Sequence, residues 1–205
     1  MTGILKVDQW KDSGDNTLMT SDGAGVLTAN AGIIIPSGAT ITNNGTATGF
    51  GGGKIGQVIQ STKTNSETFT LATGTLADVS GLSLNITPSS ITSKILVEYR
   101  MHLGRQGTNP VPYSCLLRDG SIIFRGDSVG SRQRATATYG SGVGTETNAI
   151  NTQIFLDSPS STSSLTYKIQ VGGFSSRVFY VNIPDVNSSA MPTATSTITA
   201  MEVLA

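Results

Sequence analysis

Apolar and polar side chains alternate along several stretches of the chain. The clearest is residues 94–103 (KILVEYRMHL), where the two kinds alternate over ten residues. Successive side chains of a strand point to opposite faces of a sheet, so a period of two predicts a strand and does not fit a helix. Residues 82–86 and 165–171 alternate in the same way. The side chains expected on the buried face of the first stretch are Ile95, Val97, Tyr99, Met101 and Leu103.

A tight hairpin is predicted where Asp119 and Gly120 separate two apolar runs, residues 113–117 and 122–125. Both central residues of a type I′ turn need a positive φ, which Asp-Gly pairs adopt readily. This pair is therefore a strong local hairpin signal.

The segment 54–205 is predicted to form an all-β domain. Further strands are expected at 55–62, 68–72, 149–156, 178–183 and 197–204, and no stretch of ten or more residues has helical apolar spacing. Short strands recurring at such intervals are typical of a sandwich or barrel. Around ten antiparallel strands predict a two-sheet sandwich of jelly-roll type, in which each sheet has one packed face and one solvent-facing face.

The first 53 residues have a different character. Residues 1–22 contain a short apolar run and then the only tryptophan, Trp10, whereas residues 23–53 are a Gly/Thr-rich strip with almost no charge. The strip reads as short β segments between glycine-containing turns, and residues 49–53 read as a hinge into the sandwich. Its large apolar residues are too few to close a core in one chain: Val26, Leu27, Ile33, Ile34, Ile35 and Ile41.

Two interpretations of this strip are open. It is disordered, or three copies bury these residues along a common axis as an intertwined β shaft. The isoleucines and valines depart from the low-hydrophobicity signature of disorder, so we favour the shaft and a homotrimer.

Composition supports β structure and narrows the partners. Ser and Thr make up about a quarter of the chain, there are 24 glycines, and 13 basic residues cancel 13 acidic ones. A neutral chain has no global field to attract nucleic acid or an anionic membrane. Residues 1–10 lack the apolar core of a signal peptide, and no apolar run is long enough for a membrane helix, so neither export nor membrane insertion is predicted.

The sequence lacks a constellation typical of catalysis. It has one histidine, His102, and one cysteine, Cys115, which cannot form a zinc site, and its carboxylates are scattered. Cys115 is predicted to be a small buried residue of a strand. We therefore predict no enzymatic activity, no cofactor and no metal.

Arginines are concentrated between residues 100 and 134, with only two aspartates among them. Either these arginines decorate the solvent-facing face and loops of the sandwich, or they bind anionic groups such as those of a surface polysaccharide. Guanidinium groups suit bidentate contact with carboxylate or phosphate, and Tyr113 and Phe124 are close enough in sequence to stack on sugar rings. The residues proposed for receptor contact are Arg105, Arg118, Arg125, Arg132, Arg134 and Tyr139.

Several phrases of the sequence resemble a known family. The segment GILKVDQWKDSGDNTLMTSDGAGVLTANAGIIIPSGATITNNG is similar to the amino-terminal part of tail-fibre and related virion proteins of marine and freshwater bacteriophages, including cyanophages. The segments KIGQVIQSTKT, FTLATGTLADVSGLSLNITPSSITSKILVEYRM, FLDSPSSTSSLTYKIQV and STITAMEVLA are similar to the sandwich domain that follows in such proteins. The resemblance covers nearly the whole chain.

The resemblance implies a homotrimeric virion protein made in the bacterial cytoplasm. Its N-terminus would be anchored on a tail, baseplate or capsid protein, and its C-terminal sandwich would contact the host surface. Residues 1–22 would dock as an apolar peptide in a groove or on a sheet edge, through Ile4, Leu5, Val7 and Trp10. Packing of Trp10 inside the trimer is the alternative.

Three other functions remain open at this point. The chain could be a capsid-decorating head fibre with a purely structural role, or a tailspike-like polysaccharide depolymerase, for which it is short and poor in paired acids. A host lectin with a jelly-roll fold would leave residues 23–53 without a purpose.

Overall fold

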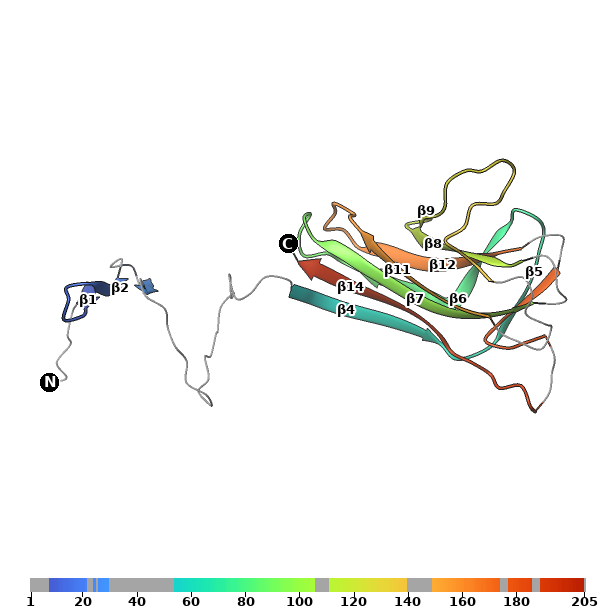
Figure 1. The fold of residues 1–205 in the computed structure, drawn as a ribbon, viewed down its shortest axis with the longest axis horizontal. Helices are drawn as coiled ribbons and strands as arrows, with labels where there is room; N and C mark the ends of the chain where they lie inside the picture. Colours follow the sequence, from blue (N-terminus) through green and yellow to red (C-terminus); the bar gives the residue numbers. More distant parts are fainter. Residues whose placement is uncertain are drawn as a thin grey trace. The chain divides into compact units, whose positions relative to one another are not determined.

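The computed structural model describes residues 8–21, 24, 26–29, 54–105, 111–139, 149–173, 177–185 and 189–204. Its strands form antiparallel sheets, and the described residues contain no helix (Figure 1). The all-β prediction is therefore confirmed. The chain divides into two compact units, Met1–Phe50 and Gly51–Ala205, so the division falls within the predicted hinge at 49–53. We call them the N-terminal unit and the sandwich unit and describe each by itself.

The N-terminal unit contains a three-stranded antiparallel sheet of β1 (Gln9–Lys11), β2 (Thr17–Ser21) and β3 (Leu27–Ala29). The Asp12 carboxylate accepts bonds from the backbone nitrogens of Gly14 and Asn16, both 2.9 Å long, and so holds the β1–β2 turn. No side chain described in this unit is buried, and Val26 is 57% exposed. The other predicted axis side chains, those of Leu27, Ile33, Ile34, Ile35 and Ile41, lie outside the described residues.

The sandwich unit contains the remaining strands, and most of their bounds agree closely with the predicted segments. They are β4 (Lys54–Lys63), β5 (Glu67–Leu71), β6 (Leu76–Ile86), β7 (Lys94–Arg105), β8 (Tyr113–Arg118), β9 (Ser121–Phe124), β10 (Ala137–Thr138), β11 (Ala149–Asp157), β12 (Leu165–Gly172), β13 (Arg177–Val181) and β14 (Ser196–Leu204). The exceptions to this agreement are β6, which begins at Leu76 instead of residue 82, and β10, which was not predicted.

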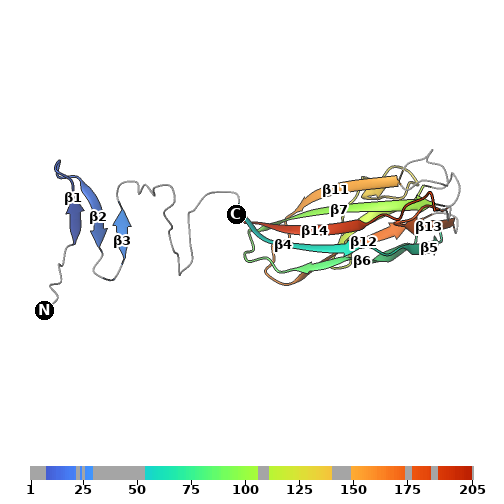
Figure 2. The same ribbon diagram turned by 90° about the horizontal axis from the view of Figure 1, so that it is seen from below.

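These strands form two sheets. In one, which we call the β7 sheet, the order is β4-β14-β7-β13-β5, and β11 also pairs with β7. In the other, the β12 sheet, the order is β10-β8-β12-β6, and β9 also pairs with β8. The chain crosses repeatedly between the sheets, so strands such as β4 and β14 are neighbours although they lie at opposite ends of the unit's sequence (Figure 2).

The core lies between the two sheets. The five predicted residues of β7, from Ile95 to Leu103, are at most 2% exposed, which confirms the alternation. They belong to one apolar cluster with inward-facing residues of β6 and β12, such as Leu82 and Ile169. Burying one side chain of this size contributes about 1.5–3 kcal/mol, so this shared interior is the main stabilising feature of the unit.

The Asp-Gly hairpin is also confirmed. Strands β8 and β9 pair antiparallel, and Asp119 and Gly120 have φ values of 49° and 81° between them. The Asp119 carboxylate accepts a 2.8 Å bond from the backbone nitrogen of Thr166, which fixes the turn against β12.

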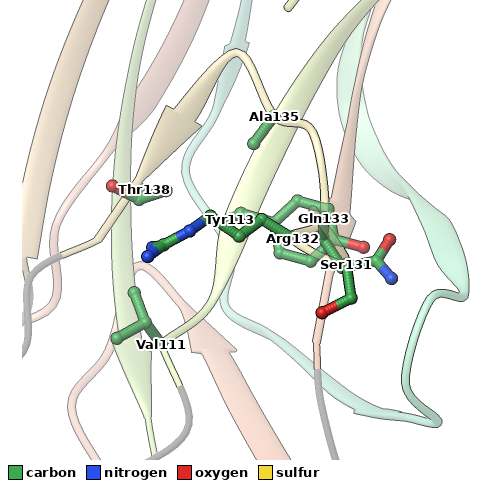
Figure 3. Close-up of a pocket in the computed structure, with 7 residues that line it drawn as sticks. All are labelled: Val111, Tyr113, Ser131, Arg132, Gln133, Ala135 and Thr138. Carbon is green, nitrogen blue, oxygen red and sulfur yellow. The ribbon is translucent and has the colours of Figure 1, made fainter. Parts of the chain in front are cut away.

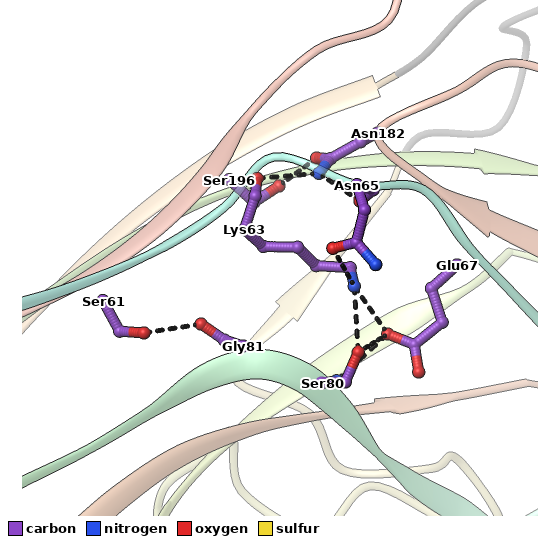
Figure 4. Close-up of polar contacts among 8 residues, drawn as sticks. All are labelled: Ser61, Lys63, Asn65, Glu67, Ser80, Gly81, Asn182 and Ser196. Carbon is purple, nitrogen blue, oxygen red and sulfur yellow. Dashed lines mark hydrogen bonds and ion pairs between the residues drawn. The ribbon is translucent and has the colours of Figure 1, made fainter.

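A buried polar cluster lies where β4 and β6 meet (Figure 4). Lys63 is 1% exposed, and its Nζ donates to Ser80 Oγ at 3.0 Å and to Asn65 Oδ1 at 3.1 Å. The same Nζ lies 3.0 Å from Glu67 Oε2, which also accepts bonds from Ser80. The Asn182 amide donates to the backbone oxygens of Lys63 and Asn65. A buried ammonium is stable only when such partners replace water.

We expect Lys63→Met to lower the free energy of unfolding by about 2–3 kcal/mol, because it removes the partner of a partly buried carboxylate and several hydrogen bonds. Lys168→Met is the matched control, since Lys168 pairs with Asp78, whose side chain is 58% exposed, and such a pair is worth about 0–1 kcal/mol. Urea unfolding followed by circular dichroism at one fixed protein concentration measures both. Equal losses would contradict the structural role of the buried cluster.

A second buried charge lies on β14. Glu202 is 2% exposed, and its carboxylate accepts bonds from Ser89 N at 2.6 Å, Ser89 Oγ at 2.7 Å and Gln57 Nε2 at 2.9 Å. Burial acts to raise the pKa of this carboxyl, but the hydrogen bonds from Ser89 and Gln57 outweigh it and lower the pKa to about 2. The ionised form is therefore part of the folded state.

We expect Glu202→Gln to lower the free energy of unfolding at pH 7 by about 1–3 kcal/mol, because a neutral amide accepts more weakly and turns an NH₂ toward a donor. The pKa of the carboxyl is about 4.3 in the unfolded chain and lower in the folded one, so ionised Glu202 stabilises the fold at pH values above about 4.3. This stabilisation is lost as the pH falls through the folded-state pKa. The difference between the two proteins should therefore shrink from about pH 4 to pH 2. Denaturant titrations across this range measure it, with the exposed Asp127→Asn as control. A constant difference at all pH values would contradict the assignment.

Candidate anion-binding site

The outward side of β8 carries a second, smaller apolar cluster. Tyr113, Cys115 and Leu117 point away from the main core and pack with Leu76, Ile122 and Ala135. Residues 125–136, which we call the cover loop, lie over this part of the β12 sheet and contribute Ala135 to the cluster. Cys115 is fully buried, as predicted, and its pKa is raised by that burial.

The cover loop is held by hydrogen bonds at both ends. The backbone nitrogen of Gly126 donates to Ala135 O at 3.0 Å, and Arg134 Nε donates to Gly126 O at 2.7 Å. Thr136 N donates to Ser114 O at 2.9 Å, and Thr136 Oγ1 accepts a bond of the same length from Leu116 N. These bonds place the loop's arginines at defined positions over β8, as a binding site requires.

The Tyr113 ring lies over Gly172, its partner on the neighbouring strand β12. A Cβ atom at position 172 would lie 2.1 Å from Tyr113 Cζ, so only glycine leaves room for the ring in this orientation. The side chain is 4% exposed, and burial raises the pKa of its hydroxyl.

Two cavities adjoin Tyr113, with volumes of about 460 and 300 Å³. Tyr113, Arg132 and Gln133 line both (Figure 3 draws the larger). The larger is completed by Val111, Ser131, Ala135 and Thr138, and the smaller by Gly74, Leu76, Ile122, Arg125 and Arg134.

The charge of this site has one sign. Three arginines line the cavities, and none of the described residues that line them is acidic. Arg125 and Arg132 are exposed, whereas Arg134 is half-buried and held by its bond to Gly126. Guanidinium groups beside a tyrosine and a glutamine amide can bind carboxylate, sulfate or phosphate groups and hydroxyls together.

Three of the predicted receptor residues, Arg125, Arg132 and Arg134, are therefore brought together. The other three are not. Arg105 is 4% exposed at the end of β7, and Tyr139 is 2% exposed with its hydroxyl 3.4 Å from Ser114 Oγ in the core. Arg118 lies 2.6 Å from Asp157 and is engaged in an ion pair. Arg105 and Tyr139 are inside the domain, so the prediction of receptor contact is corrected for these two residues. For Arg118, which is paired but has a side chain that is 27% exposed, it stays a prediction.

Sequence reasoning missed part of this site. Gln133 and Ser131 gave no signal of their own, although Gln133 stands between two arginines. Tyr113 had been noted as a possible stacking residue, but its position over Gly172 follows from the pairing of β8 with β12. Phe124, noted with it, stacks instead on Phe155, with the ring centroids 4.7 Å apart.

Of the four residues predicted for virion docking, the structure describes one. Trp10 lies on β1 and is 40% exposed, while Ile4, Leu5 and Val7 lie outside the described residues. In the part of the chain that the structure describes, no group of His, Cys, Asp and Glu could hold a metal ion. The same part contains no helix that is long and apolar enough to cross a membrane.

Comparison with known proteins gives no relation: no protein-family model matches the chain, and no curated protein is similar to it.

Proposed function

We propose that this chain is a non-enzymatic subunit of a homotrimeric bacteriophage tail or baseplate fibre. Its N-terminus anchors it to another virion protein, and its sandwich binds an acidic polysaccharide of the host surface. The observation that carries the binding role is the pair of cavities lined by Arg125, Arg132 and Arg134 around Tyr113. The virion role is supported by the family resemblance of the sequence.

The cavities suit an acidic sugar in size and chemistry. Their volumes are at the lower end of the range of about 300–1,000 Å³ that is usual for small-ligand sites. The arginines supply charge-assisted donors for a uronate or sulfate group, and Gln133 and Ser131 supply neutral partners for sugar hydroxyls. The site is open to solvent, as binding to a long polymer requires.

The trimer is supported by the N-terminal unit. Its strands are three to five residues long, and none of its described side chains is buried. A sheet this small lacks a core of its own and is stable only with further packing partners. Copies of the same segment are the partners that a fibre supplies. In the sandwich unit, the repeated crossing between the two sheets supports the jelly-roll class.

We expect Arg132→Ala to weaken binding of polygalacturonate, a uronic-acid polymer, by about tenfold or more, because a hydrogen bond to a charged group is worth about 1.5–3 kcal/mol. The triple change of Arg125, Arg132 and Arg134 to Ala should abolish it. Arg177→Ala is the matched control, since Arg177 is an exposed arginine of β13 in the other sheet. Calorimetry at two salt concentrations, with neutral dextran as a second ligand, measures the effect.

Equal binding by the Arg132 and Arg177 variants would refute the site. If the wild-type chain binds neither the polymer nor host cells, the purely structural role of a capsid-decorating fibre replaces the receptor-binding role.

We expect deletion of residues 1–22 to abolish incorporation of the chain into virions, because the docking segment is lost. The truncated chain should keep the oligomeric mass of the full chain if residues 23–53 form the shaft, although β1 and β2 are lost with the deletion. Immunoblotting of purified particles and sedimentation velocity measure the two outcomes. Particles that still carry the truncated chain would place the anchor elsewhere.

A further inference from the structure

Part of the outward face of the β7 sheet is apolar. Among the described residues of the sandwich unit, seven large apolar side chains are well exposed, and five of them lie on β4 and β11. Those five are 46–58% exposed, whereas the other two, Ile91 and Val129, lie outside the strands. The five are Ile55, Val58, Ile150, Ile154 and Leu156.

The strand register joins most of these residues into one surface. Val58 is paired with Met201, Met201 with Leu96, and Leu96 with Leu156, so one apolar row crosses β4, β14, β7 and β11. Figure 2 shows these four strands side by side. On one side of this row, Ile55 of β4 is paired with Val203 of β14. On the other side, Ile154 precedes Leu156 by two residues on β11. We call this surface, with Ile150 further along β11, the apolar face.

The outward face of the β12 sheet is different. There Asp78 accepts bonds from Lys168 at 2.8 Å and Gln170 at 2.7 Å, and Asn85 accepts a bond from Thr166 at 2.8 Å. On β6 and β12 this face is adapted to water by its own polar pairs, and its apolar cluster on β8 is covered by the cover loop. The apolar face is therefore not a consequence of the chain's composition, and an apolar surface of this extent marks an interaction site.

The charges on the apolar face favour a second copy of the same chain as its partner. Glu98 and Arg100 are the next two outward positions of β7 after Leu96, so acid and base stand side by side in the middle of the sheet. In a three-fold ring the contacts are heterologous, so the acid of one copy can be placed against the base of the next copy. An anionic polymer or a membrane surface offers only one sign.

The point where the chain enters the sandwich favours the same partner. Lys54 begins β4, pairs with Leu204, and is followed directly by Ile55 of the apolar face. If residues 23–53 hold three chains together, as proposed above, they bring three such entry points into proximity. Tethering of this kind gives effective concentrations in the millimolar range, at which a modest apolar surface is sufficient for association.

We propose that the sandwiches of three copies associate through the apolar face, with Ile154, Leu156 and Val58 at its centre. The β12 sheet, with its arginine-lined cavities, then faces outward. This inference rests on the proposed homotrimer and adds a second contact to it, in the sandwich unit itself.

Cysteine labelling of the full chain tests the covering of the face. Ile154 and Val129 are 58% and 60% exposed in a single chain, and the native Cys115 is buried, so Ile154→Cys and Val129→Cys are a matched pair. We expect a maleimide to label position 154 at least about tenfold more slowly than position 129, because position 154 is accessible only in a dissociated minority. Val58→Cys should behave like Ile154→Cys. Equal labelling rates would overturn the proposal.

Sedimentation velocity of Ile154→Lys separates this contact from the rest of the trimer. We expect a buried ammonium to raise the dissociation constant of the full-length trimer at least about 100-fold, whereas Val129→Lys leaves it unchanged. Ile154→Thr, which keeps a β-branched side chain, should give a smaller shift and guards against misfolding of the lysine variant. If the wild type is trimeric and Ile154→Lys dissociates no more readily, the apolar face is refuted but the trimer stands. A monomeric wild type refutes both, and polysaccharide binding remains a separate measurement.

Discussion

The interior shared by the two sheets is the constraint on which the rest of the structure depends. Strands of the β7 sheet and the β12 sheet both contribute side chains to it, and β7 contributes five that are almost completely buried. Because successive side chains of a strand point to opposite faces, the other side chains lie on the outward face of each sheet. The two outward faces are on opposite sides of the sandwich. The chemistry of those two faces is therefore free to diverge. One carries polar pairs such as Lys168–Asp78 beside the covered cluster around Tyr113, and the other carries the apolar face beside Glu98 and Arg100.

Two of the chain's few charged side chains, those of Lys63 and Glu202, are buried beside this interior. Lys63 and Glu202 lie near the edges of the core, where backbone turns, serines and amides supply the bonds that water would otherwise give. Because Ser, Thr and Asn abound in this sequence, such partners are available at most positions. These buried charges connect β4 to β6 and β14 to the turn after β6, and removal of either charge leaves its partners without a hydrogen bond.

The fold was largely predictable, and the site was predictable in part. Alternation in residues 94–103 and the Asp119-Gly120 pair are local signals, and both were confirmed. Arg125, Arg132 and Arg134 were chosen for their residue type and share one site because the cover loop folds back on β8. Arg105 and Tyr139 were chosen on the same ground, yet both side chains are buried. Whether a side chain near the end of a strand faces water depends on tertiary packing. That information is not carried by local sequence.

The candidate binding site and the apolar face lie on different sheets of the sandwich. Tyr113 and its arginines lie on the outward side of the β12 sheet, and Ile154 lies on the outward side of the β7 sheet. Association through the apolar face would therefore leave every arginine-lined cavity open to solvent. Three such sites, each with its two cavities, would bind one polysaccharide at several points, and linked weak sites raise the overall affinity without any new contact. A site of modest affinity on each chain would then be sufficient for attachment, because the proposed trimer would supply avidity.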